Sequence, residues 1–450
     1  MQTNFSAEQL QDPRIAEADG ILQRCIHCGL STATCSTYVL LGDERDSPRG
    51  RIYLMKDMFE GNHDASKAIT FHIDRCLSCL SCMTTCPGGV DYMHLVDLAR
   101  GHIEDTYTRP VKDRLIRRLL VAVLPHPDRF KAALWGASLA RPFRALFRAV
   151  GLKEIAAMLD LAPARGPALS KGVAPGVYPA LGRARKRVAL LTGCAQQALR
   201  PEINEATVRL LCRHGIEVVV PDDQVCCGAL VHHMGRDEDA GEAAKRNIDA
   251  WSAVGREGPL DAVIINASGC GTVVKDYAHM LARDEGYRER ADELCVITKD
   301  ITEFVADIGL ASPVIWSGLR IAYHSACSMQ HGQRVNSEPR ALLKEAGFSV
   351  AEVPEGHICC GSAGTYNILQ PKIANELRDR KARNIESAKP DAVAAGNIGC
   401  IAQLKDACEA PIVHTVELLD WATGGPCPEE LAHLQDRVKK LESFIQERAE

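Results

Sequence analysis

The sequence predicts an α+β protein of several domains, in which a helical, cysteine-rich N-terminal domain precedes two duplicated α/β domains. Seven of the 19 cysteines fall between Cys25 and Cys86, in a segment of short helical patterns and turns. Beyond residue 187, apolar runs typical of buried strands alternate with helical patterns, and one cysteine pattern occurs twice. We therefore expect an N-terminal domain at 1–108, a basic segment and linker at 109–186, repeats at 187–318 and 319–426, and a C-terminal helix at 427–450.

Composition excludes several classes of protein. With 450 residues, 46% hydrophobic and 25% charged, the chain is long enough for two or three cores. A formal net charge of -5 gives no general attraction to nucleic acid, so no nucleic-acid partner is expected. No apolar run reaches the roughly 18 residues of a spanning helix, and no signal peptide is seen, so we expect a cytoplasmic chain. In a reducing cytoplasm, many cysteines indicate metal ligation or redox chemistry.

The strongest motif is a cysteine run in the first domain. Cys76, Cys79 and Cys82 are each separated by two residues, and Cys86 follows after three more and precedes Pro87. This is the spacing of a bacterial ferredoxin-type cluster run, in which the first three thiolates hold one 4Fe-4S cluster and the fourth reaches a second. A run of this kind implies a partner run elsewhere in the chain.

The partner run has the same spacing but lacks one thiol. Ser31 occupies the place of its third cysteine, and Ser36 replaces the usual proline. Exchange of the fourth cysteines between the two runs predicts two clusters. The predicted ligands are Cys35, Cys76, Cys79 and Cys82 for one cluster, and Cys25, Cys28 and Cys86, with Ser31 in the fourth place, for the other.

Ser31 determines the nature of the second cluster. A serine hydroxyl is a weaker acid and a harder donor than a thiol, so it suits iron in a sulfide cluster less well. Three outcomes stay open: an oxygen-ligated 4Fe-4S cluster, a 3Fe-4S or labile cluster, and an empty site. Zinc is the alternative metal, but tandem runs with this spacing are more typical of iron–sulfur clusters.

The segment from Arg109 to Lys153 is basic and amphipathic. It contains eleven Lys or Arg residues against two acids, Asp113 and Asp128, with apolar residues at helical spacing. Such a face suits anionic lipid, a partner subunit or solvent equally well. The following residues, 162–187, are rich in Pro, Gly and Ala and indicate a linker.

Apolar runs predict strands in the two α/β repeats, and a final periodic stretch predicts a helix. Leu431, Leu434, Val438, Leu441 and Ile445 recur at three- and four-residue steps, as one face of an amphipathic helix does. The expected strands include Val188–Leu191, Val218–Val220, Ala262–Ile265, Arg320–Tyr323 and Ala392–Ala394.

Each repeat carries four patterned cysteines, which we call a Cys-Cys-Gly module. The first cysteine precedes the adjacent pair by 32 residues in both modules, and the last follows the pair by 43 residues in one and 40 in the other. Each cysteine follows an apolar run, so the four should meet at the carboxyl edge of a sheet. Such thiols suit a further cluster or thiol–disulfide chemistry, and occupancy of both modules, one or neither stays open. Module 1 comprises Cys194, Cys226, Cys227 and Cys270; module 2 comprises Cys327, Cys359, Cys360 and Cys400.

Other residues near these motifs have simpler interpretations. Four cysteines outside the patterns are expected to be ordinary buried side chains. Five histidines near the modules are expected to be hydrogen-bonded core or surface residues. The cysteines are Cys212, Cys295, Cys408 and Cys427, and the histidines are His232, His233, His324, His331 and His357.

Several segments together resemble the iron–sulfur subunit of bacterial glycolate oxidase, within the wider family of Cys-Cys-Gly iron–sulfur oxidoreductases. They are Cys25-Ile26-His27-Cys28-Gly29, Ser47-Pro48-Arg49-Gly50-Arg51, Asp74-Arg75-Cys76-Leu77, Cys360-Gly361-Ser362-Ala363-Gly364 and the doubled modules. The resemblance implies an α-helical ferredoxin domain and maps the family's ligands onto Cys25, Cys28, Cys35, Cys76, Cys79, Cys82 and Cys86, while Ser31 departs from the family.

The resemblance also implies a function. Flavin-binding glycolate oxidase subunits would oxidise glycolate to glyoxylate, and this chain would pass the electrons to a quinone or another membrane acceptor, as a peripheral protein. Subunits of lactate or glycerol-3-phosphate dehydrogenases and of heterodisulfide reductase are the alternatives. No G-x-G-x-x-G fingerprint follows an expected strand, so substrate oxidation is expected on a partner and no catalytic residue is assigned here.

Overall fold

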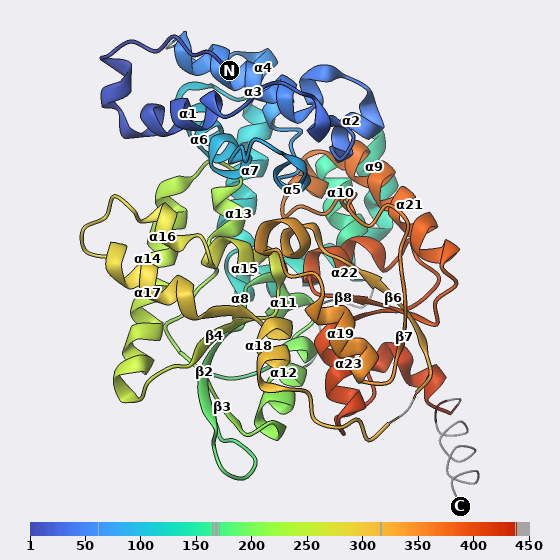
Figure 1. Ribbon diagram of the computed structural model, residues 1–450. Coiled ribbons are helices and arrows are strands. Elements are labelled where there is room, and N and C mark those ends of the chain that lie inside the picture. The colour runs from blue at the N-terminus through green and yellow to red at the C-terminus, as the bar shows by residue number, and fades with distance from the viewer. Residues whose placement is uncertain are drawn as a thin grey trace, which may run out of the picture.

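The computed structural model describes residues 1–61, 63–163, 166, 170, 172–315, 317–436 and 438. Its helical N-terminal part lies across one end of two neighbouring sheets (Figure 1). This mixture of a helical region and two helix-covered sheets confirms the predicted α+β multidomain class. Within the described residues, every helix is too short or too polar to cross a membrane.

The N-terminal helices enclose a core of their own. Leu22, Met55 and Leu95 are fully buried in it. The start of α3 is fixed by Ser47, whose side chain accepts a hydrogen bond from the N–H of Gly50. The elements are η1 (Gln9–Gln11), α1 (Pro13–Gln23), η2 (Leu30–Thr32), α2 (Ser36–Leu41), η3 (Glu44–Asp46), α3 (Pro48–Glu60), α4 (Lys67–Ile73), α5 (Ser81–Thr85) and α6 (Tyr92–Thr106).

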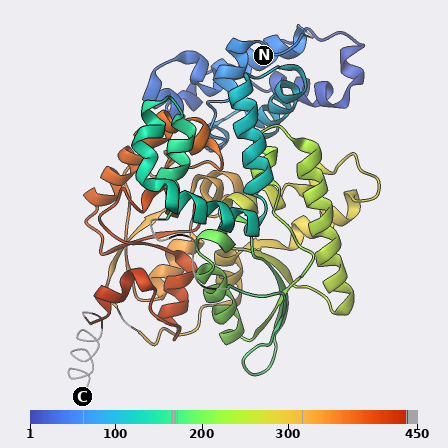
Figure 2. The same ribbon diagram turned by 180° about the vertical axis from the view of Figure 1, so that it is seen from behind.

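The basic segment forms helices that run from the N-terminal region down the back of both repeats (Figure 2). Ile116, Leu120 and Leu134 face inward and are buried. The opposite face is exposed and carries both arginines and apolar side chains. The elements are α7 (Val111–Val123), α8 (Pro127–Ala140), η4 (Arg141–Phe143), α9 (Arg144–Ala149) and α10 (Lys153–Leu161).

The first repeat is built around a five-stranded sheet in the order β1-β3-β2-β4-β5. All neighbouring strands are parallel except β1, which pairs antiparallel with β3 at the edge. The strands are β1 (Gly176–Tyr178), β2 (Lys186–Leu191), β3 (Ile216–Val220), β4 (Ala262–Ile265) and β5 (Thr298–Asp300). The helices are α11 (Ala195–Leu199), α12 (Glu202–Arg213), α13 (Ala229–His232), α14 (Asp237–Glu257), α15 (Ser268–Val274), α16 (Tyr277–Met280), α17 (Arg288–Ile297) and α18 (Ile301–Ile308).

The second repeat is built around a parallel four-stranded sheet in the order β7-β6-β8-β9. This order matches β3-β2-β4-β5 strand for strand, which supports an internal duplication. The strands are β6 (Arg320–His324), β7 (Ser349–Ala351), β8 (Ala392–Ala395) and β9 (Ile412–His414). The helices are η5 (Ser328–Gln333), α19 (Glu338–Glu345), α20 (Tyr366–Leu369), α21 (Pro371–Ser387), α22 (Ile398–Leu404), α23 (Thr415–Ala422) and η6 (Glu429–Leu434).

The five named apolar runs all lie within strands, whereas four short strands were not predicted. The strands β1, β5, β7 and β9 have three residues each, which is too short for a recognisable period-two pattern. β1 lies inside the segment interpreted as a linker, where its glycine and prolines hide the strand signal. Part of that segment therefore belongs to the first sheet.

The C-terminal stretch differs in detail from the expected amphipathic α-helix. Its described part begins with the 3-10 helix η6, in which Leu431 is fully buried against the second repeat. Val438 is also buried. Leu441 and Ile445 lie outside the described residues.

The two repeats share one apolar core and are joined by buried ion pairs. Arg200 on the first repeat donates to Glu417 on α23 at 2.8 Å. Arg209 and Arg213, both on α12, donate to the carboxylate of Asp420, which is 1% exposed. A buried carboxylate is stable only with such partners, so these contacts fix how the two sheets lie relative to each other.

We expect Asp420→Asn to lower the free energy of unfolding by about 3 kcal/mol, because it leaves two arginines without their buried anion. Asp160→Asn is the matched control, since Asp160 pairs with Arg148 at a more exposed site and its loss should cost under about 1 kcal/mol. Thermal and urea unfolding of both variants measures the difference. Equal stability of the two variants would contradict the role given to Asp420.

Candidate metal centres

One group of predicted ligands surrounds a small cavity beside α1, which we call cavity A. Cys25, Cys28, Ser31 and Cys86 all line this space of about 30 Å³. Gly29 follows Cys28 in the left-handed conformation (φ 79°), and a Cβ there would lie 2.5 Å from the Arg49 guanidinium. Cys82 borders this cavity as well, so the structure brings the sulfurs of Cys25, Cys28, Cys82 and Cys86 together with the Ser31 hydroxyl.

The second group lines an adjoining cavity, which we call cavity B. Cys35, Cys76, Cys79 and Cys82 border a space of about 20 Å³. The chain wraps around it because Ser78 and Leu80 both adopt left-handed backbone conformations, with φ of 46° and 60°. Arg100 holds the same turn by donating to the carbonyl of Cys76 at 2.8 Å and the hydroxyl of Ser78 at 2.6 Å.

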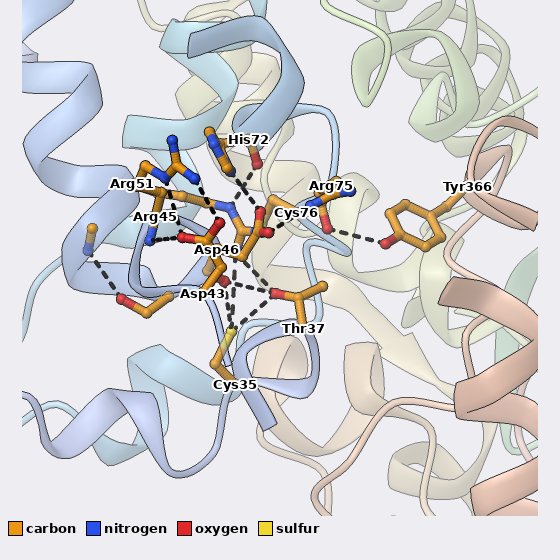
Figure 3. A network of polar contacts seen from close by, with 12 residues as sticks. Cys35, Thr37, Asp43, Arg45, Asp46, Arg51, His72, Arg75, Cys76 and Tyr366 are labelled. Carbon is orange, nitrogen blue, oxygen red and sulfur yellow. Dashed lines mark hydrogen bonds and ion pairs between the residues drawn. The ribbon is translucent and has the colours of Figure 1, made fainter. Parts of the chain in front are cut away.

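A buried network of charges supports cavity B (Figure 3). The carboxylate of Asp46 is fully buried and contacts Arg51 at 3.2 Å, His72 at 3.0 Å and Arg75 at 2.8 Å. Arg51 also donates to Thr37 at 3.1 Å, and the Thr37 hydroxyl lies 3.3 Å from the sulfur of Cys35. The network therefore fixes the loop that carries Cys35 and places a permanent cation beside the sulfurs.

The donor chemistry of both cavities fits iron–sulfur clusters. Burial raises the pKa of the Cys79 and Cys82 thiols well above the ordinary value, so a thiolate at either position requires a positive centre to offset its charge. Cavity B offers four convergent sulfurs, as a 4Fe-4S cluster requires. With Cys82 assigned to cavity B, cavity A offers the sulfurs of Cys25, Cys28 and Cys86 and the Ser31 hydroxyl, so it can hold a cluster with one weaker ligand.

The Cys-Cys-Gly modules line a third and much larger cavity, which we call cavity C. Its volume is about 390 Å³, and cysteines of both modules border it. Sulfur–sulfur distances are 3.3 Å between Cys194 and Cys226 and 3.7 Å between Cys327 and Cys359. The cysteines that line cavity C are Cys194, Cys227 and Cys270 of module 1 and Cys327, Cys359, Cys360 and Cys400 of module 2.

Steric contacts explain why glycine follows the paired cysteines in each module. Gly228 and Gly361 are left-handed, with φ of 85° and 87°. A Cβ on Gly228 would lie 3.2 Å from the carbonyl oxygen of Ala240, and one on Gly361 would lie 2.4 Å from that of Ala374. Each paired-cysteine loop can therefore approach the helix behind it only with glycine at this position.

His324 is a residue that the sequence analysis did not assign to the site. It is 2% exposed, and the sulfurs of Cys360 and Cys400 and a ring nitrogen of His324 all lie within 4.8 Å of one another. Burial lowers its pKa to about 3, so the imidazole is neutral. In the sequence, the one feature that could have pointed to His324 is its position at the end of a strand, three residues before Cys327.

The remaining histidines and cysteines have other surroundings. His232 contacts Asp97 at 3.3 Å and Asp237 at 3.1 Å, and His331 shares a hydrogen bond of 2.7 Å with Thr84. His233 borders cavity C. Among the described residues, the lining of all three cavities excludes the four cysteines outside the patterns, Cys212, Cys295, Cys408 and Cys427.

Comparison with known proteins defines the class. A family described as "4Fe-4S dicluster domain" matches residues 21–90, and one described as "Cysteine-rich domain" matches twice, at 188–275 and 321–405. Together with the fold, these matches define the chain as an iron–sulfur protein with a duplicated cysteine-rich domain.

Relatives define the family more narrowly. The glycolate oxidase iron–sulfur subunit of Escherichia coli is 40% identical over 94% of this chain and 99% of that protein. The probable glycolate oxidase iron–sulfur subunit of Bacillus subtilis is 30% identical over 94% of this chain and 99% of that protein. The chain belongs to the family of glycolate oxidase iron–sulfur subunits.

More distant proteins share parts of the sequence or the fold. Lactate utilization protein A of Bacillus subtilis is 26% identical over 52% of this chain and 99% of that protein. A crystal structure of a hypothetical protein from Helicobacter pylori has a TM-score of 0.53 at 10% identity, covering 93% of this chain and 74% of that one. This last likeness concerns the fold alone.

We expect Ser31→Cys to add about one iron per chain, or to replace a 3Fe-4S EPR signal, because a fourth thiolate completes the ligand set of cavity A. Ser31→Ala is the companion variant: it should lose iron only if the Ser31 oxygen is a ligand. Iron and sulfide analysis with EPR on protein purified without air measures both. Identical iron content and spectra in Ser31→Cys and the parent would contradict the idea that this site is compromised.

Proposed function

We propose that the chain is the electron-transfer subunit of a glycolate-oxidising complex. Flavin subunits oxidise glycolate to glyoxylate, and this chain passes the electrons on to a quinone-type acceptor. The observation that carries the proposal is the arrangement of three cysteine-lined cavities in series. Membership of the glycolate oxidase iron–sulfur subunit family supports the choice of substrate.

The cavities adjoin because they share lining residues. Cys82 borders both cavity A and cavity B. Leu77 and Ser78 border both cavity B and cavity C. Leu77 also packs in one apolar cluster with Cys359, against which Cys79 and Cys327 lie. Clusters held in A, B and module 2 would therefore form a continuous path through the protein.

Each cavity has residues suited to hold its cluster. Cys35, Cys76, Cys79 and Cys82 would hold a 4Fe-4S cluster in B, and Cys25, Cys28 and Cys86 with Ser31 would hold the cluster in A. The clusters would supply one-electron storage and transfer. The chain's own residues bury Cys25, Cys35 and Cys76, leave Cys28 exposed, and place the Arg51 charge beside cavity B.

The walls of cavity C support a quinone-type acceptor. Cavity C has a volume of about 390 Å³, more than tenfold larger than cavity A at about 30 Å³ or cavity B at about 20 Å³. Its wall opposite the cysteines is apolar and comes from α7, α8 and α10. A cavity of this size leaves room for an apolar ligand beside a metal centre. The contributing side chains include Leu120, Val123, Phe130, Leu134, Ile155 and Met158.

The outer face of the same helices supports a peripheral position on a membrane. Arg114 and Arg118 are exposed on it, whereas Arg117 is not free to meet lipid because it pairs with Asp74 at 3.2 Å and Asp113 at 3.1 Å. A face that combines exposed apolar and basic residues suits an anionic lipid surface. The exposed apolar side chains are Val111, Leu115, Leu119, Trp135, Leu139, Phe143, Leu146 and Val150.

A thiol–disulfide reductase is the second candidate function. It is favoured by the short sulfur–sulfur distances in the two modules, 3.3 Å for Cys194 and Cys226 and 3.7 Å for Cys327 and Cys359. Hydrogen bonds from Cys194 and Cys227 lower the pKa of Cys226, which would make it the attacking thiolate. In this alternative, module 1 is itself the catalytic site and requires no flavin partner.

We expect Cys359→Ser and Cys360→Ser to abolish glycolate-dependent quinone reduction by the reconstituted complex, because they interrupt the path at module 2. Glycolate should still reduce the flavin and the clusters of A and B. Cys408→Ser, a partly buried cysteine outside the cavities, is the control and should keep full activity. Disulfide turnover by the isolated chain, without flavin subunits, would instead favour the reductase.

We expect the triple variant Leu115→Ser, Leu139→Ser, Phe143→Ser to weaken binding to anionic phospholipid vesicles at least about tenfold, because each removed side chain takes away apolar area. Val296→Ser with Val314→Ser is the control, since both valines are exposed elsewhere on the surface. Vesicle flotation of the complex measures binding. Unchanged recovery of the triple variant would mean that this face does not rest on lipid.

A further inference from the structure

The two Cys-Cys-Gly modules differ at one position beside their cysteines. Leu191 ends β2 three residues before Cys194, and His324 ends β6 three residues before Cys327. Both residues occupy the same place in the duplicated fold, because β2 and β6 are corresponding strands of the two sheets. At this position module 2 therefore has a nitrogen donor where module 1 has an apolar side chain.

The surroundings of His324 leave its nitrogen without a hydrogen-bond partner. Nε2 is buried, and no residue that the structure describes donates to it or accepts from it. An unsatisfied buried polar atom costs about 1–3 kcal/mol, so it is retained where it has another use. A ring nitrogen of His324 and the sulfurs of Cys360 and Cys400 all lie within 4.8 Å of one another, close enough to share a metal ion.

The chemistry of this trio suits iron. A neutral imidazole and two thiolates are all ligands for iron in clusters, and mixed sulfur–nitrogen sites occur among iron–sulfur centres. Cys327 and Cys359 lie beside the trio and supply two more sulfurs. Asn397 donates to the sulfur of Cys400 at 3.5 Å and so helps to position it.

We propose that His324 binds iron through Nε2, together with Cys360 and Cys400, so that module 2 holds a mixed sulfur–nitrogen iron centre. The inference rests on the proposed function only in requiring iron at module 2. Binding involves no net redox change: the neutral ring nitrogen donates its lone pair, and its proton stays on Nδ1.

A consequence for electron transfer follows from charge. A neutral imidazole at an iron position that would otherwise take an anionic ligand keeps one negative charge off the centre, which favours the reduced state. Lys381 adds to this effect, because it is buried beside module 2, where it donates to the carbonyl of Glu355 at 2.8 Å. At module 1, α14 instead presents the neutral Asn247 to the paired-cysteine loop. The centre of module 2 should therefore have the higher reduction potential of the two modules.

The test is nitrogen hyperfine coupling. Protein grown with ¹⁵N-histidine and purified without air is studied by pulsed EPR through a redox titration, and a directly bound ¹⁵N coupling is expected. His324→Leu, which copies module 1, should abolish this coupling and lower the potential. His331→Gln is the matched control, because His331 is buried in the same repeat but bonds to Thr84 rather than facing a cysteine; its coupling and potential should be unchanged.

A second measurement detects a centre that is not paramagnetic and therefore gives no EPR signal. Mössbauer spectra of ⁵⁷Fe protein detect every iron, and the component of the nitrogen-bound iron should change in His324→Cys while total iron stays constant. Iron at module 2 without any histidine coupling or spectral change overturns the inference and leaves the proposed function intact. Zinc in the trio, or no metal there, also overturns it. Loss of clusters A and B from the parent would instead contradict the proposed function.

Discussion

Burial of cysteine sulfur in three adjoining cavities is the constraint on which the rest of the structure depends. Burial raises the pKa of the Cys79 and Cys82 thiols, so these two become good ligands only beside a cation. The backbone around them is shaped accordingly. Left-handed turns at Ser78 and Leu80 direct the sulfurs of cavity B inward, and Gly361 lets a paired-cysteine loop contact its helix.

Fixed charges and hydrogen bonds maintain the distance between the N-terminal region and the second repeat. Asp46 is satisfied by three cationic or polar partners inside the N-terminal region, and this makes the loop around Cys35 rigid. From the same loop, Ser36 accepts a hydrogen bond of 3.0 Å from the N–H of Cys359. Tyr366 donates to the carbonyl of Arg75 at 3.1 Å. Cavity B therefore adjoins module 2 through contacts made by residues next to the ligands themselves.

Duplication explains the architecture of the two repeats, and divergence explains how they differ. The strand order and the steric role of the glycine are the same in both. Their electrostatic surroundings are not: module 2 has His324 and the buried Lys381, where module 1 has Leu191 and Asn247. Metal centres held by the two modules would therefore differ in reduction potential.

The sequence by itself determined the features that depend on local spacing. The exchange rule predicted the ligand grouping of Cys25, Cys28 and Cys86 apart from Cys35, and the apolar runs predicted the long strands. Only the tertiary structure decided that both modules face one cavity, that α7, α8 and α10 form its apolar wall, and that Arg117 is internally paired. It alone placed His324 beside Cys360 and Cys400. The reason is physical: ligands in one turn are positioned by the backbone between them, whereas contacts between distant segments are set by how helices and sheets pack.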